Sequence, residues 1–338
     1  MRPATALFVM LTFCFMIPEA IPAAQSGPIK AGLKGLPVAG RVRARGFVRC
    51  GGVPRPGLAQ VDARGRWSGL EVDVCRAVAA AVLGSPERIE YDGYGTPGQF
   101  DAVRDQRDDV CFLTGSEISD QDLAGVIVPG PVVFVESDAV MVPSGSSVRH
   151  VAGLAGDTIC FLSGSGAERS LSYYFDAVHK GFFALPFSER GEMDDAYNVQ
   201  RCHAIAGEIT TLAAARLAPG VNHLKSRILP EPLSVFPVMA ATPTSDARWS
   251  SIVAWTVITL VSADRPETKW YATGAGAMPV KAAELGLGKG WQQRVLSAVG
   301  SYGEIFKRNL GTGSRLRLGR GLNENQFKGG LLLAPFLD

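Results

Sequence analysis

Hydrophobic and polar positions between residues 65 and 84 predict a strand-to-helix turn followed by a helix. Apolar residues recur there at helical spacing and would form one buried face. These are Val72, Cys75, Ala79 and Val82. Glu71 and Asp73 fall in the expected first turn, where free N–H groups favour negative charge. Gly84 and Pro86 predict the end of the helix.

Short apolar segments on both sides of this helix predict strands, at 47–51 before it and 88–91 after it. A helix at 97–105 and a strand at 109–113 continue the same rhythm. A second unit repeats it, with strands at 158–162, 184–187 and 202–206 and helices at 167–179 and 192–199. Such alternation is typical of parallel sheets covered by helices, so the pattern predicts an α/β protein.

Two extended passages interrupt this alternation and predict a division into two lobes. The first passage covers 132–142, and the return passage covers 228–241, where Pro230, Pro232 and Pro237 exclude a helix. The expected lobes are 42–135 with the helical C-terminal part 241–338 for lobe 1, and 141–233 for lobe 2. The two passages would then serve as hinge crossovers.

The first 24 residues have the pattern of a cleaved export signal. Arg2 precedes an apolar run over 4–17, and small residues follow it at Ala20, Ala23 and Ala24. A lipoprotein signal through Cys14 is disfavoured, because Phe13 stands where a small residue is needed. We therefore expect an exported, periplasmic protein in an oxidising compartment.

Composition and motifs argue against several classes of function. The 338 residues are 46% hydrophobic and 20% charged, which leaves room for two domains. The net charge of +2, without basic runs interleaved with aromatics, argues against a nucleic-acid partner. No G-x-S-x-G, H-E-x-x-H or complete phosphate-binding loop occurs, and the four histidines lack metal-ligand or triad spacing. No cofactor and no metal is therefore expected.

A run of small residues, S-G-S-G at 163–166, follows one predicted strand and opens the next helix. Gly164 would let a ligand approach the backbone, and free N–H groups at a helix start favour an anion. Ser165 adds a hydroxyl. Any tight turn between a strand and a helix would show the same composition, so the motif alone does not establish a binding site.

The chain resembles the periplasmic solute-binding proteins of polar amino-acid ABC transporters, family 3, and most closely their general L-amino-acid-binding type. The resemblance rests on the block at 65–84 and on the C-terminal runs G-L-N at 321–323 and K-G-G-L at 328–331. It covers nearly everything after Gly46. It implies a two-lobed periplasmic-binding-protein fold (type II) and a non-enzymatic monomer that delivers a small polar ligand to an inner-membrane ABC permease.

The same resemblance indicates binding residues in lobe 1, with one departure. In the family, small hydroxyl residues precede a T-x-x-R segment whose arginine clamps the ligand's α-carboxylate. In the stretch 109–122, Thr114 and Ser116 match hydroxyl positions, but Gln121 stands at the arginine position. Arg55, in the first loop, could replace the missing clamp.

In lobe 2 the resemblance places Glu208 where the family holds the ligand's ammonium with an aspartate. It also puts the loop of Gly164 and Ser165 at a ligand-contacting position. Glu117 adds a further carboxylate. With Gln121 in place of the clamp, these residues favour an amino-acid derivative, an amine, an amide or a short peptide over a free α-amino acid.

Removal of the signal would leave five cysteines. Two pairs are expected from adjacency in the sheet, Cys50 with Cys75 and Cys160 with Cys202. The resemblance does not require a cysteine at Cys111, which we expect to be free. Buried free thiols throughout remain the alternative.

Two other functions stay open at this point. The missing arginine at position 121 would also suit a degenerate or signalling relative that binds a protein partner. A dehydratase-like enzyme on the same fold would use Glu208 or Glu117 as its acid or base.

Overall fold

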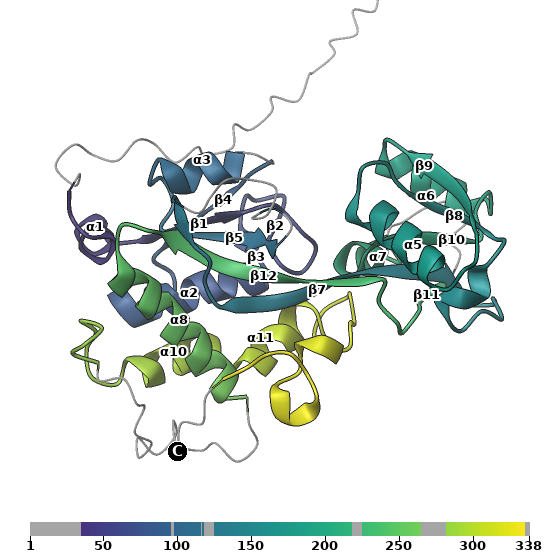
Figure 1. Ribbon diagram of the computed structural model, residues 1–338. Coiled ribbons are helices and arrows are strands. Elements are labelled where there is room, and N and C mark those ends of the chain that lie inside the picture. Colours follow the sequence, from purple (N-terminus) through teal and green to yellow (C-terminus); the bar gives the residue numbers. More distant parts are fainter. Residues whose placement is uncertain are drawn as a thin grey trace, which may run out of the picture.

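The computed structural model describes residues 35–95, 98–115, 117, 125–217, 225–264 and 282–334. The predicted export signal at 1–24 lies outside these residues and stays a prediction. Figure 1 shows two lobes joined by a pair of long strands. Among the described residues, no helix is both long enough and apolar enough to cross a bilayer.

Lobe 1 contains parallel strands covered by helices, as the alternating pattern predicts. β1 pairs in parallel with β4 on one side and with β5 on the other. The strands are β1 (Val48–Gly52), β4 (Ile89–Gly93) and β5 (Val110–Thr114), with a small hairpin of β2 (Gln60–Val61) and β3 (Trp67–Ser68). The helices are α1 (Val38–Arg45), α2 (Leu70–Leu83) and α3 (Gly98–Arg104).

Lobe 2 repeats this arrangement on a smaller scale. β8 pairs in parallel with both β9 and β10. Its strands are β8 (Thr158–Leu162), β9 (Phe183–Phe187) and β10 (Ala204–Glu208). Its helices are α5 (Gly166–Ala177), α6 (Arg190–Asn198) and α7 (Ile209–Ala215), with the 3-10 turn η2 (Val151–Leu154) before them.

The lobes are joined by β7 (Val132–Pro143) and β12 (Ser234–Pro243), which pair antiparallel along most of their length. β12 also pairs with β5, and β7 pairs with β10, so the sheet order is β4-β1-β5-β12-β7-β10-β8-β9. The short strands β6 (Ile127–Val128) and β11 (Ser226–Ile228) pair with β12 and β7. Pro237 lies within β12, one residue before its pairing with β5 begins at Val238.

The lobe boundaries expected from the sequence, 42–135 with 241–338 and 141–233, stay a prediction. The extended passage expected at 132–142 is one uninterrupted strand, β7. The reason is that Glu136, Ser137 and Asp138, which interrupt the apolar pattern, are buried within that strand. Polar residues in a strand do not end it when neighbouring groups satisfy them.

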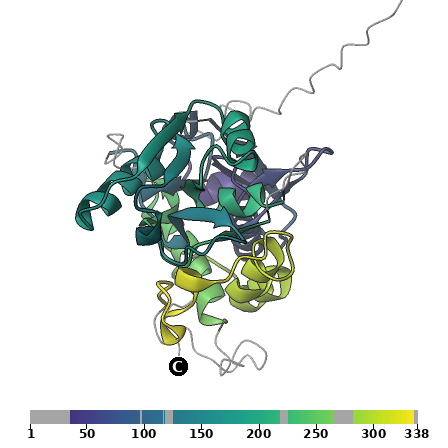
Figure 2. The same ribbon diagram turned by 90° about the vertical axis from the view of Figure 1, so that its right-hand side faces the viewer.

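The described residues of the C-terminal part include the helices α8 (Ala247–Ser262), α10 (Trp291–Val299) and α11 (Tyr302–Asn309), which lie beside lobe 1. α2 packs against all three. Figures 1 and 2 show this part on the same side of the sheet in both views. The G-L-N run forms η3 (Gly321–Asn323), and η4 (Gln326–Lys328) follows it. Asn323 bonds the Val135 N–H and C=O of β7, at 2.7 and 2.9 Å, and so ties the C-terminal part to a crossover.

α2 differs from the expected helix with one buried face, because the sheet and the C-terminal helices cover it on nearly all sides. Glu71 is completely buried, and its carboxylate accepts a hydrogen bond of 2.8 Å from the Tyr91 hydroxyl. Asp73 accepts hydrogen bonds from Arg308 and Asn309 of α11. These two acids therefore serve tertiary contacts as well as the helix start.

The structure contains the disulfides Cys50–Cys75 and Cys160–Cys202, and Cys111 is a buried free thiol on β5. The first disulfide joins β1 to α2. The second joins β8 to the turn before β10. Cys202 was expected on a strand, but β10 begins two residues later, at Ala204. The adjacency of β8 and β10 still brings the two sulfurs together.

These observations predict the labelling of the cysteines in protein lacking residues 1–24. Iodoacetamide should label no cysteine in the native protein and only Cys111 after unfolding without reductant, because the other four are oxidised. Peptide mass mapping reads the result, and reduction before alkylation, which should label all five, is the control. A disulfide involving Cys111 would contradict the prediction.

Candidate functional site between the two lobes

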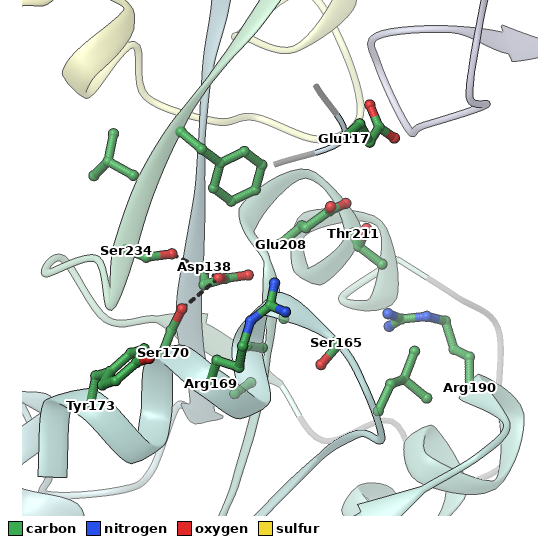
Figure 3. Close-up of a pocket in the computed structure, with 17 residues that line it drawn as sticks. Glu117, Asp138, Ser165, Arg169, Ser170, Tyr173, Arg190, Glu208, Thr211 and Ser234 are labelled. Atoms are coloured by element: carbon green, nitrogen blue, oxygen red, sulfur yellow. Dashed lines mark hydrogen bonds between the residues drawn. The ribbon is translucent and has the colours of Figure 1, made fainter. Parts of the chain in front are cut away.

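A cavity of about 550 Å³ lies between the two lobes, within the roughly 300–1,000 Å³ typical of small-molecule sites. Lobe 2 supplies most of its wall, from the first turn of α5, the start of α6 and the end of β10. Both crossovers and one residue of lobe 1 complete it. Figure 3 shows its charged lining residues, Glu117, Asp138, Arg169, Arg190 and Glu208.

The residues predicted to bind ligand are distributed unevenly around this cavity. Ser165 and Glu208 line it. Gly164 precedes Ser165 in the same turn. Ser116 and Gln121 lie outside the described residues, so their roles stay predictions, including the proposed loss of the carboxylate clamp.

Thr114 is buried at the end of β5 and contacts Glu117. Its backbone N–H donates to a Glu117 carboxylate oxygen at 2.7 Å, and the Glu117 N–H donates to the Thr114 hydroxyl at 3.2 Å. Reciprocal bonding of this kind resembles a helix capping box. It holds the Glu117 carboxylate at the edge of the cavity, so Thr114 influences the site through Glu117.

Arg55 is carried by the first loop, residues 54–59, which is fixed to the start of α2. Arg55 and Ala59 exchange two backbone hydrogen bonds, of 2.9 and 3.0 Å. Carbonyl groups of the loop also accept hydrogen bonds from the first N–H groups of α2. The Leu70 N–H donates to the Gly57 carbonyl and the Glu71 N–H donates to the Leu58 carbonyl, both at 3.0 Å. Gly69 permits this contact with φ 136° and ψ 174°, a region essentially restricted to glycine.

Arg55 lies among carboxylates of both lobes and is only 7% exposed. Its guanidinium donates to Glu117 at 2.9 Å and lies 4.0 Å from the carboxylate of Glu208 in lobe 2. Burial by itself lowers the pKa of Arg55, but four carboxylates outweigh that effect and raise it. They are Glu117, Glu71, Glu208 and Glu136. An internal cation therefore already lies between two carboxylates expected to attract the ligand.

Asp138 is a lining residue that the sequence reasoning missed. It lies opposite Glu208 in the antiparallel pairing of β7 and β10. Its carboxylate accepts hydrogen bonds from Ser170 at 2.8 Å and from Ser234 at 2.7 Å, as Figure 3 shows. The signal that could have revealed it is a carboxylate inside an otherwise apolar strand, because such a group requires specific partners.

Glu136, two residues earlier on β7, is fully buried. It accepts hydrogen bonds from the Thr210 hydroxyl at 2.6 Å and from the Ser137 N–H at 3.0 Å. Burial, and then repulsion from Glu208, raise its pKa to about 7. Burial also raises the pKa of Glu208, although Arg55 opposes the shift. The crossover therefore carries a carboxyl that titrates near neutrality.

Some hydrogen-bonding groups of the turn at 163–166 are already paired with Glu168 in the first turn of α5. The Gly164 N–H donates to the Glu168 carboxylate at 2.6 Å, and the Ser165 hydroxyl accepts the Glu168 N–H at 3.4 Å. The N–H group of Gly164 is thus already occupied, whereas the Ser165 side chain lines the cavity. Among the described residues, no group of three His, Cys, Asp or Glu side chains could hold a metal ion.

Comparison with known proteins places this fold and cavity in a family, although no family model matches the chain. The general L-amino acid-binding periplasmic protein AapJ of Rhizobium johnstonii is 33% identical over 311 residues, which cover 87% of this chain and 91% of that protein. The glutamate/glutamine/aspartate/asparagine-binding protein BztA of Rhodobacter capsulatus is 30% identical over 312 residues, covering 87% and 91%.

Among solved structures, an ABC transporter periplasmic binding protein from Brucella ovis with glutathione bound has a TM-score of 0.73 and 31% identity. The alignment covers 90% of this chain and 100% of that chain. The two-lobed fold is that of a periplasmic binding protein. The chain belongs to the periplasmic binding proteins of amino-acid ABC transporters.

The buried carboxyls predict how stability depends on pH. Burial raises the pKa of both Glu71 and Glu136 from 4.5 to about 7. Between these values the folded state holds more protons than the unfolded state, so the free energy of unfolding falls as pH rises. The slope is at most about 1.4 kcal/mol per pH unit for each group. Glu136→Gln should make it shallower, measured by urea unfolding from pH 4.5 to 8.

Glu90→Gln is the matched control, because the Glu90 side chain is 48% exposed. In this variant the free energy of unfolding should change with pH at the same slope as in the wild type. A wild-type slope in the Glu136→Gln variant would show that this carboxyl does not hold an excess proton in the folded protein.

The contact between the first loop and the start of α2 predicts that alanine destabilises the protein more at Gly69 than at Gly65. A Cβ at Gly69 would lie 2.1 Å from the Leu58 carbonyl oxygen, whereas one at Gly65, with φ 74°, would meet nothing within 4 Å. Gly69→Ala should therefore lower the free energy of unfolding by at least about 2 kcal/mol. Gly65→Ala should lower it by about 1 kcal/mol, from backbone strain alone. Equal losses in urea unfolding would contradict the proposed contact.

Proposed function

We propose that this chain is the exported substrate-binding protein of an amino-acid-type ABC transporter. Residues 1–24 direct export and are removed, and the mature monomer delivers its ligand to an inner-membrane permease. The two lobes, 42–135 with 241–338 and 141–233, close on the ligand about the crossovers at 132–142 and 228–241. Membership of the family supports this role. The relatives are transport binding proteins, which is consistent with a non-enzymatic function.

The observation that carries the ligand proposal is the pair of carboxylates on the lobe-2 side of the cavity. Asp138 and Glu208 lie opposite each other on adjacent strands and both line the cavity. Glu117 is paired with Arg55 at 2.9 Å, whereas Glu208 is 4.0 Å from the same guanidinium. Two carboxylates on adjacent strands of the lobe-2 wall suit a ligand ammonium.

The ligand's carboxylate is expected to be held differently from the family pattern. Gln121 stands where the arginine clamp is expected, and an amide cannot replace a charge-assisted bidentate contact. Arg55 is engaged by carboxylates, which disfavours its use as a substitute clamp. We therefore favour an amine-bearing ligand with a masked or absent α-carboxylate, such as an amide or a short peptide.

The relatives include both kinds of ligand. AapJ and BztA are named for amino acids, whereas the Brucella ovis structure contains glutathione, a short peptide. That structure is 31% identical to this chain over 90% of its length. Its ligand supports a peptide-sized occupant of this cavity. Glutathione keeps a free α-carboxylate beside its amine, so the preference for a masked α-carboxylate rests on position 121 alone.

Calorimetry tests this proposal with glutathione, short peptides, amides and free L-amino acids. Removing one partner of a buried charged pair typically costs ~2–5 kcal/mol, so free L-amino acids should bind roughly thirtyfold to several thousandfold more weakly than with a clamp. Gln121→Arg should recover at least about thirtyfold of that affinity. Gln293→Arg, at an exposed helical position, is the control and should recover none.

Micromolar binding of free L-amino acids by the wild type, unaffected by Arg55→Ala, would show that the role assigned to Gln121 is wrong. Absence of binding to every amine-bearing compound would point instead to a relative that binds a protein partner. Consumption of a bound compound would indicate a dehydratase-like enzyme with Glu208 or Glu117 as its acid or base.

A further inference from the structure

Two arginines on the lobe-2 wall of the cavity are not explained by the features described above. Arg169 lies in the first turn of α5, after β8, and Arg190 is the first residue of α6, after β9. Both line the cavity. Figure 3 shows both guanidinium groups directed toward the cavity, with Ser165 drawn between them.

The structure leaves Arg190 with an incomplete set of partners. Its nearest carboxylate is that of Asp194, one turn later on α6, at 4.0 Å, and both side chains are partly buried. The Arg190 Nη1 atom and the Asp194 Oδ1 atom are both buried without a hydrogen-bond partner, so this edge of the guanidinium is directed at Asp194. The Arg190 side chain is nevertheless 36% exposed and lines the cavity, so its other donors can bind a ligand oxygen there.

Arg169 is also available. It is exposed, and no carboxylate among the described residues lies within ion-pair distance of it. Arg55 offers the contrast, because Glu117 at 2.9 Å and Glu208 at 4.0 Å neutralise it. Of these three arginines around the described cavity, the two in lobe 2 are therefore the ones with capacity for an additional anion.

The lobe-2 wall thus carries both charge signs, from different elements. The carboxylates of Asp138 and Glu208 come from β7 and β10, whereas the guanidinium groups come from α5 and α6. A ligand with an ammonium at the first pair and a carboxylate at the second would match both. Arginine suits this role, because its planar donors can bind a carboxylate through two parallel hydrogen bonds.

We propose that Arg169 and Arg190 form a carboxylate subsite in lobe 2. The ligand class is then a peptide or amino-acid derivative that bears an amine and, remote from it, at least one free carboxylate. This inference rests on the proposed function. Gln121 of lobe 1 is expected to lack the contact with the ligand's carboxylate, and two arginines on helices of lobe 2 would supply that contact.

The test uses calorimetry with reduced glutathione and with its glycine monoethyl ester, in which the carboxylate remote from the amine is masked and the amine with its adjacent carboxylate is kept. Arg169→Gln and Arg190→Gln should each weaken glutathione binding at least about tenfold, because each removes a charge-assisted contact. Binding of the ester should be weaker in the wild type and unchanged in both variants. Arg190→Lys should retain part of the glutathione affinity, because a cation remains.

Arg201→Gln is the matched control, since Arg201 is an exposed lobe-2 arginine outside the cavity lining. It should leave both affinities unchanged. Thermal unfolding without ligand checks that each variant folds. If Arg190→Gln does not, the exposed Arg169→Gln carries the test alone.

Unchanged glutathione affinity in both glutamine variants would overturn the subsite and leave the proposed function standing. Equal losses for glutathione and its ester would also overturn it, because the effect would then not depend on the remote carboxylate. If the wild type binds neither compound nor any other amine-bearing probe, the proposed function fails, and the subsite fails with it.

Discussion

The antiparallel pairing of β7 with β12 is the constraint on which the rest of the structure depends. These strands run through both lobes, pair with each other, and pair with β5 on one side and β10 on the other. The strands of both lobes are therefore joined through this pair into one hydrogen-bonded sheet. Asn323 adds a clip from the C-terminal part, because its amide bonds both backbone groups of Val135. One side of the cleft is therefore formed by two paired strands, whose hydrogen bonds fix the positions of the residues along them.

Electrostatics in the cleft follow from this geometry. β7 carries Glu136 and Asp138, and its pairing with β10 brings Glu208 opposite Asp138. Three carboxylates are thus placed close together on two adjacent strands, where burial raises the pKa of Glu136 to about 7. Arg55 of lobe 1 lies 4.0 Å from Glu208, so a charge pair joins the two lobes at this point. A partly exposed charge pair of this kind contributes only modestly to stability.

The charged side chains around the cavity differ in how completely other groups of the protein pair with them. Asp138 accepts two hydroxyl hydrogen bonds and Arg55 has a carboxylate at 2.9 Å. Arg190, by contrast, has Asp194 at 4.0 Å as its nearest carboxylate among the described residues. Such unmet capacity is available to a ligand, whereas a group that the protein has already paired contributes less to affinity.

Local sequence alone determined the alternation of strands and helices and the extended character of the crossovers, because period and proline chemistry are short-range. The expected cysteine pairs depended in addition on adjacency in the predicted sheet, since the paired residues lie 25 and 42 positions apart. Only the tertiary structure decided which charges meet. Glu71 and Asp73 match a helix start in sequence, yet folding buries them, and Asp138 and Glu208 face each other across 70 residues because of strand register. Distances between side chains from different elements cannot be read from any local pattern, because packing of the whole chain sets them.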